Sequence, residues 1–170
     1  MKQTLIFTTL FLAAIFFSNI SFGQTQFDLP QNIELKTKQD YTKYETTFID
    51  AAKWLEETDL DKEADKRQQI NAFVLQWISG SPTINIEINE QLGKIYGKNA
   101  QLLGLFLASY AGNIIENKNS SNKFSATKAG LISIMKVYKK RIEITKSKEM
   151  DKIIMLTDVE LDSYIRDKFK

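Results

Sequence analysis

Residues 99–115 form a long uncharged stretch that is apolar on nearly every side when it is read with helical spacing. The apolar positions on one side are Leu102, Leu103, Phe106, Leu107, Tyr110, Ile114 and Ile115, and Leu105, Ala108 and Ala111 extend the apolar surface round the helix. A helix with such a surface lies in a protein interior or crosses a membrane. A span needs roughly 20 predominantly apolar residues, whereas Asn99, Gln101 and Asn113 interrupt this stretch. We therefore predict a buried central helix on which the other segments pack.

Several other segments carry apolar residues along one side only, as helices do when they pack on a core. The spacing predicts such helices over about residues 40–57, 60–80, 125–144 and 148–170, with a break in the last of them. A shorter helix is expected to begin after Asn89 and to end near Gly97. The pattern predicts an all-α single domain over residues 38–170, a bundle of five to six helices around one central apolar helix. An extended N-terminal arm is expected before it, at residues 24–37.

Polar residues and a glycine predict how several of these helices begin and end. Asp59 is expected to cap the helix over 60–80, and Ser125 the helix over 125–144. Gly80 is expected to end its helix in the left-handed conformation. Thr157 and Glu160 match a capping box, which places a helix start inside the C-terminal segment.

Two further patterns concern the connections between helices. Isoleucines alternate with polar residues at Ile84, Ile86 and Ile88, the only place where the apolar period changes to two. A lone strand has no sheet to join, so we expect an extended connector held by the three isoleucines. Small residues recur every fourth position in the central helix at Gly104, Ala108 and Gly112. This spacing allows another helix to approach closely.

The first 23 residues have the features of a secretory signal peptide. Lys2 supplies a positive start, residues 5–17 supply an apolar core, and Ser21 and Gly23 place small residues before a cleavage site at Gln24. An uncleaved anchor would require a longer apolar run. We therefore expect a periplasmic or secreted protein, with no transmembrane span in the mature chain.

Composition narrows the classes of function. The 170-residue chain has a formal net charge of +2, and the signal segment contributes one basic and no acidic residue, so the mature chain is nearly neutral. This neutrality argues against nucleic acid as the main partner, because phosphate contacts need a net basic surface. The sequence contains no cysteine and no histidine, so it lacks disulfides, the commonest general base and the commonest metal ligand. We expect no cofactor.

One concentration of basic residues is the candidate contact site. It consists of Lys136, Lys139, Lys140 and Arg141, and we refer to these four residues as the basic cluster. Cations near the C-terminal end of a helix are stabilised by its dipole, so a solvated surface is the plainest interpretation. The alternative is contact with an anionic partner, such as lipid head groups or an acidic glycan.

Two other groups of residues suggest chemistry but also have a structural interpretation. Carboxylates gather at Asp59, Asp61, Glu63 and Asp65. A calcium site needs six to eight oxygen ligands, usually on a loop with a glycine turn that is absent here, so capping and dipole compensation are favoured while metal binding stays open. Trp54 and Trp77 have side chains suited to stacking on sugars. Trp77 lies on the apolar side of its helix and Trp54 at the edge of its own, and packing is favoured for both.

Parts of the chain resemble a known group of proteins. The stretches concerned are Trp54-Leu55-Glu56-Glu57-Thr58, the segment from Arg67 through Trp77-Ile78-Ser79-Gly80-Ser81-Pro82, and Leu102-Leu103-Gly104-Leu105-Phe106. Together they resemble an uncharacterised family of secreted all-helical proteins of Bacteroidota-type bacteria. The resemblance covers about half of the mature chain and contains no catalytic motif. It implies a shared helical fold and export, and it implies no activity.

These observations favour a non-enzymatic binding or structural component of the cell envelope. The expected partner is an unknown envelope protein or an anionic surface component. Two alternatives remain, a small enzyme that works without histidine and an inhibitor or immunity-type protein. Polar residues that converge on a pocket would favour the enzyme, whereas an exposed apolar or basic surface would favour binding.

Overall fold

Eight helices make up the part of the chain that the computed structural model describes, residues 27–118 and 122–169, and no strand occurs there. In chain order they are α2 (Lys38–Lys43), α3 (Glu45–Glu57), α4 (Ala64–Gly80), α5 (Glu90–Tyr96), α6 (Ala100–Asn117), α7 (Lys123–Lys140), α8 (Lys148–Ile153) and α9 (Asp158–Lys168). The predicted all-α class is confirmed, although five to six helices was too few. The predicted signal peptide lies outside the described residues.

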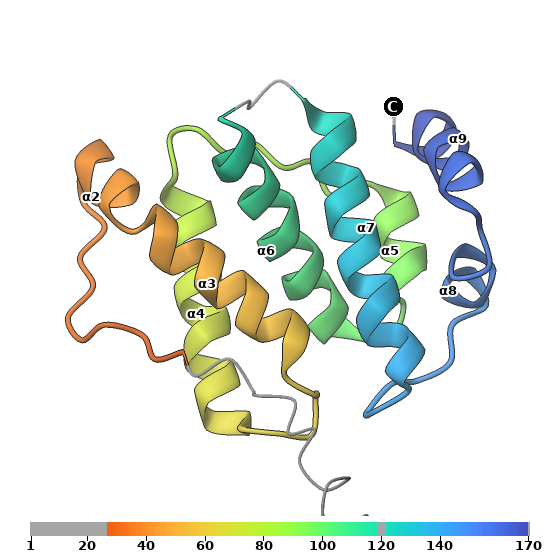
Figure 1. The fold of residues 1–170 in the computed structure, drawn as a ribbon, viewed down its shortest axis with the longest axis horizontal. Coiled ribbons are helices and arrows are strands. Elements are labelled where there is room, and N and C mark those ends of the chain that lie inside the picture. The colour runs from red at the N-terminus through yellow and green to blue at the C-terminus, as the bar shows by residue number, and fades with distance from the viewer. Residues whose placement is uncertain (1–26, 119–121, 170) are drawn as a thin grey trace, which may run out of the picture.

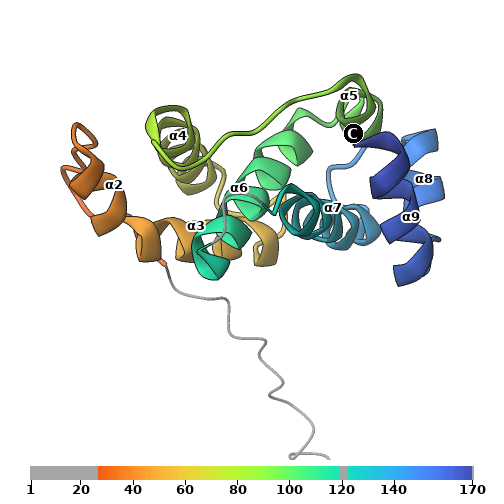
Figure 2. The ribbon, with the colours of Figure 1, turned by 90° about the horizontal axis from the view of Figure 1, so that it is seen from above.

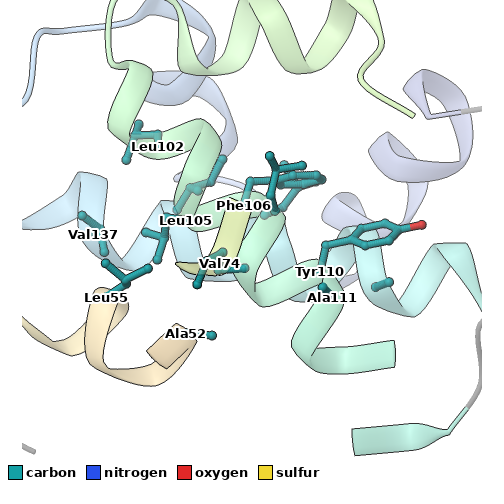
Figure 3. Close-up of a cluster of buried hydrophobic side chains, with 14 of the residues drawn as sticks. Ala52, Leu55, Val74, Leu102, Leu105, Phe106, Tyr110, Ala111 and Val137 are labelled. Atoms are coloured by element: carbon teal, nitrogen blue, oxygen red, sulfur yellow. The ribbon is translucent and has the colours of Figure 1, made fainter. Parts of the chain in front are cut away.

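Helix α6 is the predicted central helix, and its position confirms that prediction. It contacts α3, α4, α5 and α7, with α4 and α5 on one side of it in Figure 2. Its buried residues are Leu102, Leu105, Phe106, Leu107, Ala108, Tyr110, Ala111, Gly112 and Ile114. Side chains from three neighbouring helices, Leu55, Val74 and Val137, gather around Leu105 (Figure 3). Among the described residues, no helix is long and apolar enough to cross a membrane.

Figure 1 shows how the other helices lie relative to α6. Helix α7 has the most extensive contact with α6, and α3 follows. Helices α8 and α9 lie beyond α7, on the side away from α3 and α4. Residues 27–36, before the helices, form no helix themselves. Their apolar side chains Phe27, Leu29, Ile33 and Leu35 are partly buried against the core.

The close contact between α6 and α7 depends on Gly130. A Cβ atom at this position would lie 2.6 Å from Cδ2 of Phe106 and 3.0 Å from the Phe106 carbonyl oxygen. Both distances are too short for an unstrained contact, so α7 approaches α6 to a distance that only glycine permits.

The prediction that the small residues of α6 allow another helix to approach closely is confirmed at Gly104 and wrong at Gly112. A Cβ atom on Gly104 would lie 3.3 Å from Oδ1 of Asn71, which belongs to α4, and Gly112 has no neighbouring atom within 4 Å of its Cβ position. Ala108 is fully buried in the core. Gly104 therefore lies close to α4, whereas Gly112 has open space beside it.

The first predicted helix is divided at Tyr44. Its φ and ψ of −99° and 11° separate α2 from α3. Helix α2 contains no buried residue, whereas Phe48, Ala51, Ala52, Trp54 and Leu55 are buried in α3. Trp54, predicted at the edge of the apolar side, is inside the core.

The turn from α3 to α4 is held by an arginine rather than by a cap at Asp59. Arg67 donates hydrogen bonds to the carbonyl oxygens of Leu55, Thr58 and Asp59 at distances of 3.2, 2.6 and 3.0 Å. Burial lowers the pKa of Arg67 below its ordinary value. Helix α4 begins after Glu63, which has a φ of 48° and makes no side-chain cap. One carbonyl in the last turn of α3 and two in the turn after it therefore find their donor in the next helix.

Gly80 has a different role from the one predicted. It is the last residue of α4, and the helix ends at Ser81 with an extended backbone instead of a left-handed residue. The Tyr41 hydroxyl occupies the place that a side chain on Gly80 would need. The Tyr41 ring packs edge-on against Trp77, whose indole Nε1 donates to the Tyr41 carbonyl at 3.2 Å. A side chain at position 80 would have to displace the Tyr41 hydroxyl from this contact between α2 and α4.

The other predicted helix ends are confirmed in part. Asn89 caps α5 through a 2.9 Å hydrogen bond from the Leu92 amide, and Thr157 and Glu160 form the capping box of α9. Helix α7 is capped by Asn122 instead of Ser125, and it ends at Lys140 because Arg141 adopts a φ of 60°. Predicted residues beyond Lys140 therefore lie outside the helix.

The connector between α4 and α5 has no regular structure, as predicted. Ile84 and Ile86 are partly buried against the core. Ile88 is 55 % exposed, so two of the three isoleucines hold the connector.

A buried asparagine joins α6 to the segment after α7. Asn99 is 2 % exposed, donates from Nδ2 to the Thr145 carbonyl at 2.9 Å and accepts from the Thr145 amide at 2.8 Å. Both backbone groups of Thr145 are thus bound by one side chain.

We expect alanine substitutions at Gly130 of α7 and at Gly112 of α6 to change the free energy of unfolding in opposite directions. Gly130→Ala should lower the free energy of unfolding by about 1–3 kcal/mol, because the new methyl group overpacks the Phe106 contact. Gly112→Ala should raise it by about 0.5–1 kcal/mol, because alanine favours the helix and meets no neighbour. Urea unfolding of both variants tests this. If Gly130→Ala does not lower the free energy of unfolding, Gly130 does not govern how closely α7 approaches α6.

We also expect Asn99→Ala to destabilise the protein by about 1–3 kcal/mol, because it removes two hydrogen bonds from a buried position. Gln101→Ala provides the control. Gln101 makes a 3.0 Å hydrogen bond to the Glu143 carbonyl from an exposed position. Its loss should cost under about 0.5 kcal/mol. Thermal unfolding of the two variants measures the difference, and similar melting temperatures would contradict the proposed role of Asn99.

Candidate functional site

A groove with a volume of about 490 Å³ lies between α3, α6 and α7. It is lined by Ile49, Ala52, Lys53, Glu56 and Glu57 of α3, by Ser109, Gly112, Asn113 and Glu116 of α6, and by Ala129, Ile132 and Ser133 of α7. On each helix the lining residues, singly or in adjacent pairs, recur every three or four positions and so belong to one side of it. The groove is therefore a surface shared by three helices.

The groove is open because the residues along it are small. Ala52, Ser109, Gly112, Ala129 and Ser133 lie where the three helices face each other. Gly112 is the clearest case, since no atom lies within 4 Å of the position that its Cβ would take. Larger residues at these positions would fill the space between the helices.

Ion pairs connect the helices that form the groove. Lys136 of α7 lies 2.6 Å from Glu56 of α3. Lys140, one turn further along α7, donates to the Glu57 carbonyl at 3.1 Å. The hydrogen bond with Glu56 raises the pKa of Lys136 above its ordinary value. These contacts hold α7 against the C-terminal end of α3.

A second pair connects α3 with α6. Lys53 lies 3.5 Å from Glu116, and both side chains are about half exposed. Pairs this exposed contribute roughly 0–1 kcal/mol to stability. Their importance here lies in the charges that they place along the groove.

Ser133 is the most unusual polar group of the groove. The residue is 2 % exposed, and its Oγ has no hydrogen-bond partner among the described residues. A buried hydroxyl without a partner costs roughly 1–3 kcal/mol. The neighbouring Ile132 is 47 % exposed, so the same side of α7 presents an apolar side chain and a hydroxyl that is able to accept a further hydrogen bond.

The chemistry of the lining suits binding. It offers three carboxylates, one ammonium group, two hydroxyls and one amide next to aliphatic side chains. Its residues include no histidine and no cysteine. The groove thus provides charge, hydrogen bonds and apolar surface together, without a nucleophile held beside a base.

The basic cluster, predicted as a candidate contact site, makes ion pairs within the protein. Lys136 pairs with Glu56, Lys140 lies 2.7 Å from Asp59, and Arg141 lies 2.6 Å from Asp151. Arg141 also covers the Tyr138 ring, at 4.1 Å from its centroid. The hydrogen bond from Arg141 lowers the pKa of Asp151 below its ordinary value.

Lys139 is the exception within the basic cluster. It is exposed and has no ion-pair partner in the described part of the chain. The acidic partners of the other three residues offset most of the positive charge that the sequence pattern indicated. Contact with an anionic partner stays a prediction for this surface.

The acidic residues near the start of α4 are separated by their contacts. Asp59 pairs with Lys140, Asp61 lies 2.9 Å from Lys62, and Asp65 belongs to the first turn of α4. Within residues 27–118 and 122–169, no group of three or more His, Cys, Asp or Glu side chains is placed to hold a metal ion. Ion pairing and the dipole of α4 account for these carboxylates.

The two tryptophans are core residues, as favoured from the sequence. Trp77 and Trp54 are 0 % and 1 % exposed. Trp77 packs on Phe48 with ring centroids 4.5 Å apart, and the Arg67 guanidinium lies 5.3 Å from the Trp54 ring. Neither ring is accessible for stacking on a sugar.

A second polar cluster joins α5, α8 and α9. Gln91 donates to the Tyr164 hydroxyl at 2.5 Å and to Glu149 at 3.1 Å, and the Tyr164 hydroxyl donates to Glu149 at 2.9 Å. Burial raises the pKa of Tyr164 well above its ordinary value. These groups satisfy one another, so the cluster holds helices together and offers no open binding position.

The groove was not predicted from the sequence. Its residues come from three segments that are far apart in the chain, and each looks like an ordinary polar position at the edge of a helix. Gly112 was the available signal, because a glycine inside a helix is costly unless its surroundings need it. The sequence pattern assigned it to a helix crossing.

No family model, no curated protein and no solved structure matches this chain. The resemblance to secreted helical proteins therefore stays a prediction. The groove is the feature from which a function can be argued.

Proposed function

We propose that this protein is exported to the cell envelope and binds a partner there without catalysing a reaction. The groove between α3, α6 and α7 is the binding site in this proposal. Its volume of about 490 Å³ is the observation that carries the proposal, because ligand sites are concave and usually measure roughly 300–1,000 Å³.

Two properties of the groove support this assignment. Gly112 leaves its floor open, although alanine would make a more stable helix and meets no neighbour there. Ser133 places an unpartnered hydroxyl in the lining. Both features lower stability, and both favour an occupant that fills the space and completes the hydrogen bond.

Binding is favoured over catalysis by the residue types present. The sequence contains no histidine or cysteine, and the groove carboxylates of Glu56 and Glu116 lie beside Lys136 and Lys53. A small histidine-independent enzyme and an inhibitor or immunity-type protein are the alternatives. The inhibitor would use the same groove with a protein as its partner.

Export is supported by the N-terminal pattern of Lys2, an apolar run and small residues before Gln24. We expect the mature protein to begin at Gln24 or next to it. N-terminal sequencing of the protein from envelope fractions measures this. A product that retains residues 5–17 would show that the segment is an anchor and is not removed.

We expect a photoreactive amino acid at Ile132 to cross-link to the natural partner in intact envelopes. The control position is Leu75 on α4, which lies outside the groove lining and is equally exposed, at 46 % against 47 %. Discrete adducts should form from position 132 and not from position 75. Equal labelling from both positions would contradict a partner in the groove.

A pair of glycine variants makes the cross-linking test specific. Gly112→Leu places a side chain in the groove and should abolish the adduct. Gly93→Leu is the matched control, because Gly93 is also a helical glycine with no atom within 4 Å of its Cβ position, and it lies outside the groove lining. It should leave the adduct unchanged.

A further inference from the structure

The most exposed large apolar side chain of the described residues is that of Met155, which is 78 % exposed. Met155 lies in the short turn between α8 and α9. Its neighbours Ile154 and Leu156 pack against the core, and Ile153 is 1 % exposed. In this run of four apolar residues, Met155 is the one that the core does not hold. Its thioether is therefore open to solvent.

The other sulfur atoms of the described residues are enclosed. The sequence contains no cysteine. Met135 of α7 is 8 % exposed and Met150 of α8 is 0 % exposed, and both belong to the hydrophobic core. The indole rings of Trp54 and Trp77, which oxidants also attack, are 1 % and 0 % exposed. Within residues 27–118 and 122–169, Met155 is thus the one sulfur-containing side chain that a solute reaches from outside.

We propose that Met155 is a modification site for peroxides, at which the thioether takes up one oxygen atom while the protein stays folded. The sulfur attacks one oxygen of hydrogen peroxide, and an S–O bond forms as the O–O bond breaks. The departing oxygen accepts the remaining proton and leaves as water. The sulfur loses two electrons, the peroxide gains them, and the product is methionine sulfoxide. Met155 does not line the groove, so this site goes beyond the proposed function and does not depend on it.

The turn that carries Met155 is held by main-chain groups, so an added oxygen should not disturb it. The Met155 amide donates to the Lys152 carbonyl at 3.1 Å, and the Leu156 amide donates to the Ile153 carbonyl at 3.1 Å. A sulfoxide is polar, and on Met155 it stays in water. A sulfoxide on Met150 would instead be buried among apolar side chains, which costs free energy unless the oxygen finds a hydrogen bond.

Oxidation at this position changes the surface and leaves the core intact. Val159, in the first turn of α9, is 76 % exposed and follows Met155 as the next most exposed large apolar side chain of the described residues. Conversion of the Met155 thioether into a polar sulfoxide removes one of these two apolar groups. The modified protein therefore presents a more polar α8–α9 turn to its surroundings.

The test is treatment of the folded, purified protein with hydrogen peroxide, followed by peptide mapping with mass spectrometry at several times. We expect Met155 to gain one oxygen at least about tenfold faster than Met135 or Met150, because those two react only when the structure opens locally. In urea the three methionines should react at similar rates, because none of them is then covered. Similar rates in the folded protein, or an unchanged preference in urea, would overturn the proposal.

Two leucine variants separate the proposed site from the core methionines. Met155→Leu removes the exposed thioether and should gain no oxygen in the time in which the wild type gains one. Met150→Leu is the matched control, because leucine and methionine have similar volumes and such swaps are tolerated in cores. It should still gain one oxygen, at position 155. Oxygen uptake by Met155→Leu at the wild-type rate would show that the site lies elsewhere.

The singly oxidised protein should unfold at the same urea concentration as the untreated protein. Methionine sulfoxide reductases acting on both sulfoxide epimers should remove the added oxygen. A lower urea midpoint would mean that the oxygen disturbs the core, and a mass gain that persists would mean that it is not on a thioether. Either result contradicts the assignment to Met155 and leaves the groove proposal untouched, because Met155 lies outside the groove lining.

Discussion

Enclosure of α6 is the physical constraint on which the rest of this structure depends. A helix that is apolar on nearly all sides must be covered on all of them, and α3, α4, α5 and α7 provide the cover. The closest of these contacts is that of α7, where Gly130 lets the helix backbone approach the Phe106 ring. The contact fixes the rotation of α7 and thereby decides which of its residues face α3.

The groove follows from that rotation. Because Gly130 faces α6, Ala129 and Ser133 face the groove beside α3. Ala52 and Gly112, which also line the groove, are too small to fill it. The contacts of Lys136 and Lys140 hold α7 against the end of α3. The same short side chains that permit close helix packing therefore leave an open surface one turn away, lined by carboxylates and hydroxyls.

The sequence by itself determined the fold class and most of the helices. Helical periodicity requires no knowledge of partners, so the central helix, the Asn89 cap and the Thr157–Glu160 capping box could be predicted. Burial of Trp77 followed from its position on the apolar side of its helix, whereas Trp54, predicted at the edge, is buried as well. The candidate groove could not be predicted, because its lining comes from three segments separated by up to about eighty residues in the chain.

Only the tertiary structure decided the role of each glycine and of each charged residue. The Tyr41 hydroxyl lies where a side chain on Gly80 would be, the Phe106 ring and carbonyl oxygen lie where one on Gly130 would be, and no atom lies near the Cβ position of Gly112. Arg67 binds the carbonyls of Leu55, Thr58 and Asp59 in the turn between α3 and α4, and α4 begins without the predicted Asp59 cap. Three residues of the basic cluster are bound to carboxylates of other segments. In a sequence, a glycine or a charged residue looks the same whatever its role in the fold. Its effect depends on which atoms the fold places beside it, and those come from distant parts of the chain.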